Sequence, residues 1–580
     1  MASIVNRYAW TQTTWRIQPG DWAVLAMLAC GALAMMYPVL AAPSSRIIGW
    51  PGDNVQYVYA AGWIAEALRT GASPFVDPRI NAPDGLALTA TDVPYIGYIA
   101  VAPLTWLFGP VFGYNAQLAL AHFLSGLCAY LWIRHLTNSR IGGLAAGLAF
   151  MLAPFRLAHS YGHPQIVSTY PLPLFFWALD ASLQPLPNRK ALAGLAGATL
   201  LLGAASQYYL VIGLICGVVY ALLTLATRRV RLLSRVWLAV AAVLIGALLA
   251  AAPYLMTARD GIYTPYSLES TRMWSASPMN FVAPSHLHPL WGAFIEQRRP
   301  ETLWVEKTLY VGIVSGILAL VALRHCDRRW AWTGTAFVAA ILALGTDLHM
   351  GNVPLHPDTP VWLPAYYLHQ LPGTNLMRVW ARFGMVTILF VALLAGVGAA
   401  RLTHRNDASG RLYNGGGVGF GSLTKIRTVV PAVVIIGLVV LDLLPGRINE
   451  YTVLTPRPID RWLAQQPGDF AVGFVPVIDA TTNYYILFGT LTHGKRTIAF
   501  MHQAHIPPVF QDFNERSSGF PDSASAQRLR ELGIRYLLLE KPIFDGTRAF
   551  RWSVVEQRLA ETPELRVVQE VGDVVVVEFR

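Results

Sequence analysis

An aspartate follows the first apolar stretch of the chain, in the segment Gly52-Asp53-Asn54-Val55-Gln56-Tyr57. A carboxylate held at the edge of a membrane can accept the proton of a hydroxyl that attacks an electrophile, a contribution of typically ~10²–10⁴ in rate. The same position suits a helix cap, because residues 54–69 have helical spacing and Gly71 is a stop signal. Asp53 is therefore a candidate general base, with helix capping as the alternative.

Two arginines, Arg378 and Arg382, stand four residues apart just before a late apolar stretch. They would share one helical face if the next helix began early, and two guanidinium groups there suit an anionic phosphate. Ordinary flanking arginines that reach the membrane surface produce the same pattern. Arg272, close to Glu269, is a weaker candidate for the same role.

Histidines and one glutamate are further candidates for substrate contact. His159 and His163 are also four residues apart, and the spacing fits a metal site, a substrate contact or an internally bonded loop. His288 lies in a proline-bounded loop and is a candidate for acceptor contact. Glu306 opens an apolar stretch, where a charged group is either functional or paired with Lys307 or a loop arginine.

Other acidic residues compete with Asp53 for the role of base. Asp92 is the best rival, whereas Asp77 and Asp84 adjoin proline or glycine and are typical of turns. Near the C-terminus, His493, His502 and His505 have no acidic or cysteine partner at ligand spacing. A metal site there is not predicted, and the segment is expected to shape an acceptor site or to pack on the long loops.

The composition places these residues in a membrane protein. Of 580 residues, 54% are hydrophobic and 13% are charged, about half the charged fraction of a soluble domain. The excess of 44 Lys+Arg over 33 Asp+Glu fits cytoplasmic loops and does not require nucleic acid as a partner. The cysteines have neither a disulfide framework nor metal-type spacing.

Eleven transmembrane helices are predicted from apolar stretches close to 20 residues long. They are expected near 21–42, 112–133, 141–156, 164–184, 191–206, 208–227, 236–258, 304–323, 330–346, 383–400 and 428–445. Residues 93–109 are interpreted as a surface helix, because the inward segments then hold 18 basic residues against three acids. This places the N-terminus in the cytoplasm and residues 446–580 outside.

Two domains follow from this pattern. Residues 1–445 form a mostly α, polytopic domain with long outer loops at 43–111, 259–303 and 347–382. Residues 446–580 alternate strand-like and amphipathic stretches and are predicted to be an extracytoplasmic α/β domain. The glycine-rich segment 402–427 is interpreted as a flexible linker.

Several blocks of the chain resemble GT-C glycosyltransferases, polytopic enzymes that use a polyprenyl-phosphate-linked sugar. The first outer loop carries Asp53-Asn54-x-x-Tyr57 and Arg69-Thr-Gly71-Ala-Ser-Pro-Phe, and the block from Val93 to Gly109 resembles the surface helix that follows. Related blocks, shared with a large group of bacterial membrane proteins, are Leu157-Ala-His159-Ser-Tyr-Gly162-His163, Pro284-Ser-His286-Leu-His288, Glu306-Lys-Thr-Leu-Tyr310-Val-Gly312 and Leu371-Pro-Gly-Thr-Asn-Leu-Met-Arg378-Val-Trp-Ala-Arg382.

The resemblance implies an inverting glycosyltransferase of the bacterial cytoplasmic (inner) membrane, with Asp53 as base and Tyr57 in the substrate site. The donor would be a polyprenyl-phosphate-linked sugar, and the acceptor an envelope glycan, lipid or protein. Because Asn54 replaces the second acid of many relatives, the metal requirement stays open, with a divalent cation possible. A lipid-linked glycan transporter or flippase and a non-catalytic assembly protein remain alternatives.

Overall fold

The computed structural model describes residues 19–184, 189–228, 233–258, 261, 263–298, 303–403, 422–444, 446, 450–503, 505–517, 519–546 and 551–580. The chain divides into two compact units. The helical unit comprises 1–40, 118–252 and 265–449, and the mixed unit comprises 41–117, 253–264 and 450–580. The first loop and the C-terminal segment thus belong to one compact unit. Most of the glycine-rich segment 402–427 lies outside the described residues.

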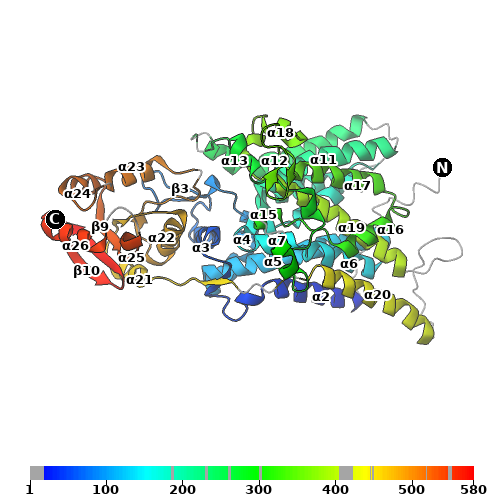
Figure 1. The fold of residues 1–580 in the computed structure, drawn as a ribbon, viewed down its shortest axis with the longest axis horizontal. Coiled ribbons are helices and arrows are strands. Elements are labelled where there is room, and N and C mark those ends of the chain that lie inside the picture. Colours follow the sequence, from blue (N-terminus) through cyan, green and yellow to red (C-terminus); the bar gives the residue numbers. More distant parts are fainter. Residues whose placement is uncertain are drawn as a thin grey trace. The chain divides into compact units, whose positions relative to one another are not determined.

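The helical unit is built from helices, some joined by short turns and others by long connections (Figure 1). Its α-helices, two of which continue into the mixed unit, are α2 (Pro19–Met35), α5 (Pro110–Thr137), α6 (Arg140–Met151), α7 (Pro154–His159), α8 (Pro164–Val167), α9 (Pro171–Ser182), α10 (Arg189–Ala205), α11 (Gln207–Arg228), α12 (Leu233–Ala258), α13 (Leu268–Arg272), α14 (Gly292–Arg298), α15 (Trp304–Lys307), α16 (Ile313–Ala322), α17 (Arg329–Ala343), α18 (Pro364–His369), α19 (Gly384–Thr403) and α20 (Ser422–Asp442). The 3₁₀ turns η3 (Pro278–Phe281), η4 (Thr374–Leu376) and η5 (Trp380–Phe383) and the short strands β4 (His349–Met350) and β5 (Val353–Pro354) lie in its connections.

Four helices among the described residues are long and apolar enough to cross a membrane, and five shorter apolar helices accompany them. This agrees with a membrane protein, while the number of eleven crossings stays a prediction. The apolar window that ends in α19 is 94% buried, whereas that of α12 is 22% buried. Helix α19 is therefore the centre of the bundle, and α12 presents apolar side chains outward, as a lipid-facing helix must.

Small residues allow α19 to approach its neighbours closely. A Cβ added to Gly142 of α6 would meet the Gly396 carbonyl oxygen at 2.6 Å, and one on Gly398 would meet the Leu318 carbonyl oxygen at 2.0 Å. Backbones this close need glycine, the usual device where membrane helices pack without a hydrophobic driving force.

Several predicted spans contain breaks that place polar residues at helix ends. The predicted reversal near Ser206 is confirmed, because α10 ends at Ala205 and α11 begins at Gln207. The prediction of one helix over 304–323 is wrong: α15 ends at Lys307, and α16 begins only at Ile313 after Gly312, whose φ is +87°. The α16 start is satisfied by Asp442, which accepts a hydrogen bond from the Val314 backbone N–H at 2.8 Å.

The mixed unit contains a five-stranded sheet in the order β10-β11-β9-β7-β8, with a parallel part and an antiparallel part. Its strands are β7 (Ala471–Val475), β8 (Arg496–Thr497), β9 (Ile534–Glu540), β10 (Leu565–Val571) and β11 (Val574–Phe579), and its helices are α21 (Pro458–Gln465), α22 (Ala480–His493), α23 (Pro508–Ser517), α24 (Ser523–Arg530), α25 (Lys541–Gly546) and α26 (Trp552–Glu561). The strand-like stretches predicted within 446–580 are confirmed, and β10 and β11 form a hairpin around Gly572, whose φ is +60°. Apolar side chains of β9 and β11 pack against α23, α24 and α26 to form the core.

The remaining elements of the mixed unit come from the first loop. Strand β1 (Arg46–Ile48) pairs antiparallel with β6 (Tyr451–Val453), and α3 (Asp53–Thr70) packs against both α4 (Tyr95–Phe108) and α22. The short strands β2 (Val76–Asp77) and β3 (Leu86–Ala87) pair with each other. The helix predicted over 54–69 is thus present and ends at Gly71, whose φ is +74°.

Candidate functional site

Four of the predicted residues meet in the helical unit. His159 ends α7, His163 follows one turn later, Glu306 lies on α15, and Arg382 lies on η5. The Arg382 guanidinium donates to both oxygens of Glu306, with Nε to Oε2 at 3.0 Å. His159 Nε2 lies 3.4 Å from the same Oε2, and its Nδ1 is 3.2 Å from His163 Nδ1.

Burial and the neighbouring Arg382 charge together determine the protonation states of Glu306 and His159. Burial alone would raise the pKa of the Glu306 carboxyl, but the charge and hydrogen bonds of Arg382 outweigh it and hold that pKa well below its usual value. Burial lowers the pKa of His159 well below its usual value, although Glu306 opposes this. The cluster is therefore a carboxylate and a guanidinium in contact, beside a neutral, fully buried imidazole. The pairing of Glu306 with a loop arginine, an alternative left open by the sequence, is what the structure contains.

Arg378 differs from Arg382 in its surroundings. The helix begins only at Gly384, and the backbone around Arg378 is extended, so the two arginines do not share a helical face. The Arg378 guanidinium carbon lies 5.3 Å from the ring centre of Tyr266 and 4.9 Å from that of Trp274. Within the described ranges no carboxylate pairs with Arg378. It is a cation held between aromatic rings, and it is half-buried.

Arg272 and His288, in contrast, are used inside the helical unit. Arg272 makes a two-pronged ion pair with the fully buried Asp347, at 2.9 and 3.2 Å. The Nε2 of His288 bonds the Leu441 carbonyl oxygen at 3.0 Å, and its Nδ1 accepts from the backbone N–H groups of Leu290 and Trp291. Both side chains thereby fix the long connections of the unit.

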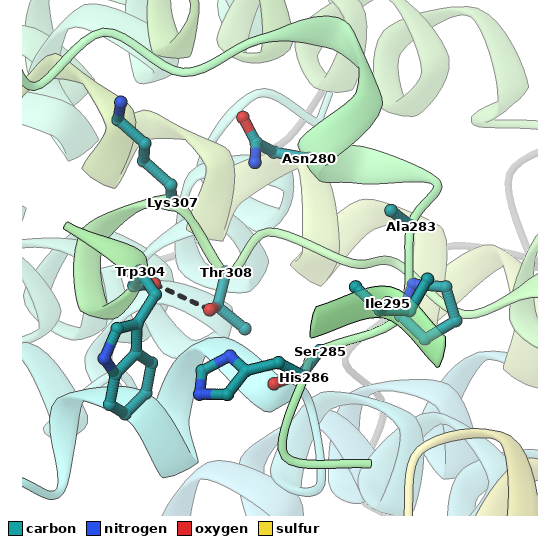
Figure 2. Close-up of a pocket in the computed structure, with 9 residues that line it drawn as sticks. Asn280, Ala283, Ser285, His286, Ile295, Trp304, Lys307 and Thr308 are labelled. Carbon is teal, nitrogen blue, oxygen red and sulfur yellow. Dashed lines mark hydrogen bonds between the residues drawn. The ribbon is translucent and has the colours of Figure 1, made fainter. Parts of the chain in front are cut away.

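A polar hollow lies on the other side of α15. Figure 2 shows that the His286 imidazole faces the Trp304 indole, at a centroid distance of 4.6 Å, while Lys307 extends away from these rings. The hollow is small, with a cavity volume of about 40 Å³, and it is open on one side. It is lined by Asn280, Ala283, Pro284, Ser285, His286, Ile295, Trp304, Lys307 and Thr308. An aromatic wall with several hydroxyl and amide groups suits a polar ligand such as a sugar. Among these residues, Lys307 was a candidate partner of Glu306, and His286 lies in one of the blocks that resemble the glycosyltransferases. Isolated Asn, Ser and Trp residues carry no local signal.

In the mixed unit, Asp53 is the first residue of α3 and is half-buried. The capping interpretation is wrong, because Gly52 is the N-cap and no side chain caps the helix there. Instead, the Asn54 amide group bonds backbone groups of the preceding turn: it donates to the Ile48 and Trp50 carbonyl oxygens, each at 2.9 Å.

Tyr484 of α22 is the principal residue that the sequence did not reveal. Its hydroxyl hydrogen bonds to the Asp53 carboxylate, and burial, followed by the Asp53 charge, raises the pKa of Tyr484. A hydroxyl that stays protonated can only donate to a carboxylate, so Tyr484 orients Asp53. No local pattern pairs these two residues, because they come from opposite parts of the chain.

Tyr57 and Asp92 are also brought together in the mixed unit. The Tyr57 hydroxyl donates to the Asp92 backbone carbonyl oxygen at 3.1 Å. The Asp92 charge acts on three further tyrosines, Tyr95, Tyr254 and Tyr263. Tyr57 lies one helical turn after Asp53, so the two side chains share one face of α3. That face therefore carries the candidate base, Asp53, and the tyrosine that is hydrogen bonded to the backbone of Asp92.

His493 has a structural place in the same unit. It lies at the end of α22, where burial lowers the pKa of its imidazole to about 4. The charge of Asp460 acts in the opposite direction, and the nearby cations Arg457, Arg79 and Lys495 lower the pKa further. Among the described residues, the terminal histidines form no group of three ligands for a metal.

The chain belongs to the family described as domain of unknown function DUF6311, which matches residues 23–413. No curated protein matches the chain. Among solved structures, the mycobacterial arabinofuranosyltransferase AftD matches 97% of this chain with a TM-score of 0.53 at 15% identity, and this chain spans 42% of that protein. ArnT from Cupriavidus metallidurans, bound to undecaprenyl phosphate, matches 97% of this chain and 98% of its own at 13% identity and a TM-score of 0.49. An Archaeoglobus fulgidus oligosaccharyltransferase has a TM-score of 0.44 at 13% identity, covering 93% of this chain and 71% of its own. The chain thus has the GT-C fold, as the sequence resemblance predicted.

Proposed function

We propose that this protein is a membrane glycosyltransferase that moves a sugar from a polyprenyl-phosphate-linked donor to an acceptor of the cell envelope. The GT-C fold supports this class of activity, and the loop motif around Asp53 supports the choice of base. The observation that carries the proposal is that the Asp53 carboxylate, at the start of α3, is hydrogen bonded and oriented by the Tyr484 hydroxyl.

The reaction needs one base and one anion-binding group. The acceptor hydroxyl oxygen attacks the anomeric carbon, and its proton passes to the Asp53 carboxylate. The bond between the anomeric carbon and the phosphate oxygen breaks, and both electrons leave with the polyprenyl phosphate. In the helical unit, Arg378 has no carboxylate partner among the described residues and offers a charge suited to a phosphate. A single displacement of this kind inverts the configuration of the anomeric carbon.

The hollow beside α15 supports a polar substrate. Its Trp304 ring is flanked by His286 on one side and by Tyr161, at 5.2 Å between centroids, on another. A rigid aromatic ring with hydroxyl groups around it is a common surface for a sugar. The hollow is too small to hold a whole sugar ring, so we assign only its aromatic mouth to contact with a glycan portion of the donor or the acceptor.

The test compares Asp53→Asn with the wild type and with Asp84→Asn, a matched control because Asp84 is an exposed acid in a turn of the same loop. The purified full-length protein is incubated with a panel of polyprenyl-phosphate-linked sugars and envelope acceptors. Asp53→Asn is expected to reduce turnover by at least ~10², and Asp84→Asn to leave it unchanged. Full turnover by Asp53→Asn would remove Asp53 as the base, and no turnover of any donor by the wild type would remove the proposed activity.

A further inference from the structure

The imidazoles of His159 and His163 and the carboxylate of Glu306 converge where α7 meets α15. The two Nδ1 atoms are 3.2 Å apart, and His159 Nε2 lies 3.4 Å from Glu306 Oε2. One donor atom from each of the three residues can be chosen so that all lie within 4.8 Å of one another. We propose that these three residues bind a divalent transition-metal ion.

An independent observation points to a ligand at this place. His159 is fully buried, and its Nε2 has no hydrogen-bond partner. The Glu306 oxygen at 3.4 Å makes a charge contact without hydrogen-bond geometry. A buried nitrogen without a partner is costly, on the order of 1–3 kcal/mol. A cation bound by His159 Nε2 would give this nitrogen a partner and remove the cost of burying it.

The spacing of the donor atoms fits a tetrahedral ion. Metal–ligand bonds of about 2.0–2.1 Å place the ligand atoms of a tetrahedral site about 3.4 Å apart. The 3.4 Å contact between His159 Nε2 and Glu306 Oε2 matches this spacing, whereas the 3.2 Å contact with His163 is made by the other nitrogen of His159. His159 can give only one of its nitrogens to the ion, so the widest pair, at most 4.8 Å, must approach by roughly 1.4 Å. His163 is half-buried and lies on a turn after α7, so its ring has room to make this adjustment.

Arg382 is compatible with the ion. A carboxylate offers about four lone-pair positions, and Arg382 uses one on each oxygen of Glu306. Metal-bound carboxylates are normally held by such second hydrogen bonds, which fix their orientation. Since Arg382 already balances the Glu306 charge, a bound ion would leave the cluster positive and suited to an anionic ligand.

The donor set indicates which metal would bind. Two imidazoles and one carboxylate favour zinc or a similar transition metal over magnesium and calcium, which prefer oxygen donors. Three protein ligands also leave one position of a tetrahedral ion open for water or a substrate oxygen. This site would exist whether or not the protein transfers sugars, so the proposal does not depend on the proposed function.

The test is metal binding by the full-length protein in detergent after treatment with a chelator. Co²⁺ is titrated and followed by the visible absorption of a tetrahedral ion, and Zn²⁺ binding is measured by calorimetry. We expect one ion per chain, with affinity at least ~10-fold lower in His163→Ala and His163→Gln. His325→Ala is the matched control, because His325 is exposed and lies outside the cluster, and it should bind as the wild type does.

Two results would overturn the proposal. One is the absence of stoichiometric binding to the wild type, and the other is unchanged affinity in both His163 variants. His163→Gln removes the imidazole but keeps a hydrogen-bonding side chain. If its unfolding midpoint in metal-free buffer equals that of the wild type, the variant is folded, and weaker metal binding is then due to the missing ligand. Because binding is read without donor or acceptor, its failure is distinct from failure of the transferase assay.

Discussion

The ion pair between Glu306 and Arg382 allows a sharp test of the helical unit. Their side chains are 3% and 7% exposed, so solvent provides little screening of the two charges. Removal of one member of such a pair leaves the other charge buried without a partner, which costs about 3–5 kcal/mol. We expect Glu306→Gln and Arg382→Gln each to lower the free energy of unfolding by this amount.

The double variant distinguishes a charge effect from general damage. When both charges are absent, neither is left unpaired, so Glu306→Gln/Arg382→Gln should be less destabilised than the sum of the single variants by at least ~2 kcal/mol. Unfolding is measured in mixed micelles with a chelator present, to exclude bound metal. Arg496→Gln, which removes an exposed ion pair with Asp469, is the control and should behave like the wild type. Additive losses in the double variant would refute the coupling.

Two further predictions concern single residues. Arg378→Lys keeps the charge but loses the planar guanidinium group between Tyr266 and Trp274, so KM for the lipid donor should rise about 10-fold while kcat changes little. Arg298→Lys, at an exposed position, is the control. An unchanged KM in Arg378→Lys would exclude Arg378 from donor binding. The folded protein holds the pKa of His493 at about 4, below the 6.5 of the free side chain, so the unfolded chain binds the proton more readily. Stability should therefore be complete above pH ~6.5 and fall by a few kcal/mol as the pH approaches ~4. Urea unfolding across this range measures the loss, and His493→Gln should remove it; an unchanged slope in that variant would contradict the assignment.

Local patterns predicted the elements well. The helix over 54–69 and its end at Gly71 follow from apolar spacing and a glycine signal within one short segment. The strands near the C-terminus follow from alternation of apolar residues in the same way. The wrong prediction of one helix over 304–323 shows where hydropathy fails, because hydropathy averages over Gly312. The helix is in fact interrupted over the segment that ends with that residue, and the new helix start is stabilised by Asp442 from another helix.

The sequence singled out the residues that meet around Glu306 but not the partners that each of them has. The pattern around Glu306 allowed either Lys307 or a loop arginine as its partner, and only tertiary packing selects Arg382. Likewise, helical spacing related Arg378 to Arg382, yet the chain is extended at Arg378, and the two side chains have different roles. Tyr484 could not be found at all, since a tyrosine in an amphipathic helix is ordinarily a core residue.

The pairing of β1 with β6 has a consequence for dissection of the protein. A chain shortened to end at residue 445 would retain the apolar helices found among the described residues. The first loop, however, would lose strand β6, which pairs with β1, and helix α22, which packs against α3. The hydroxyl that orients Asp53 would disappear with them. The last 130 or so residues are therefore not an appended module that can be removed to simplify expression, and the isolated C-terminal segment should in turn expose the α22 surface that normally packs on α3.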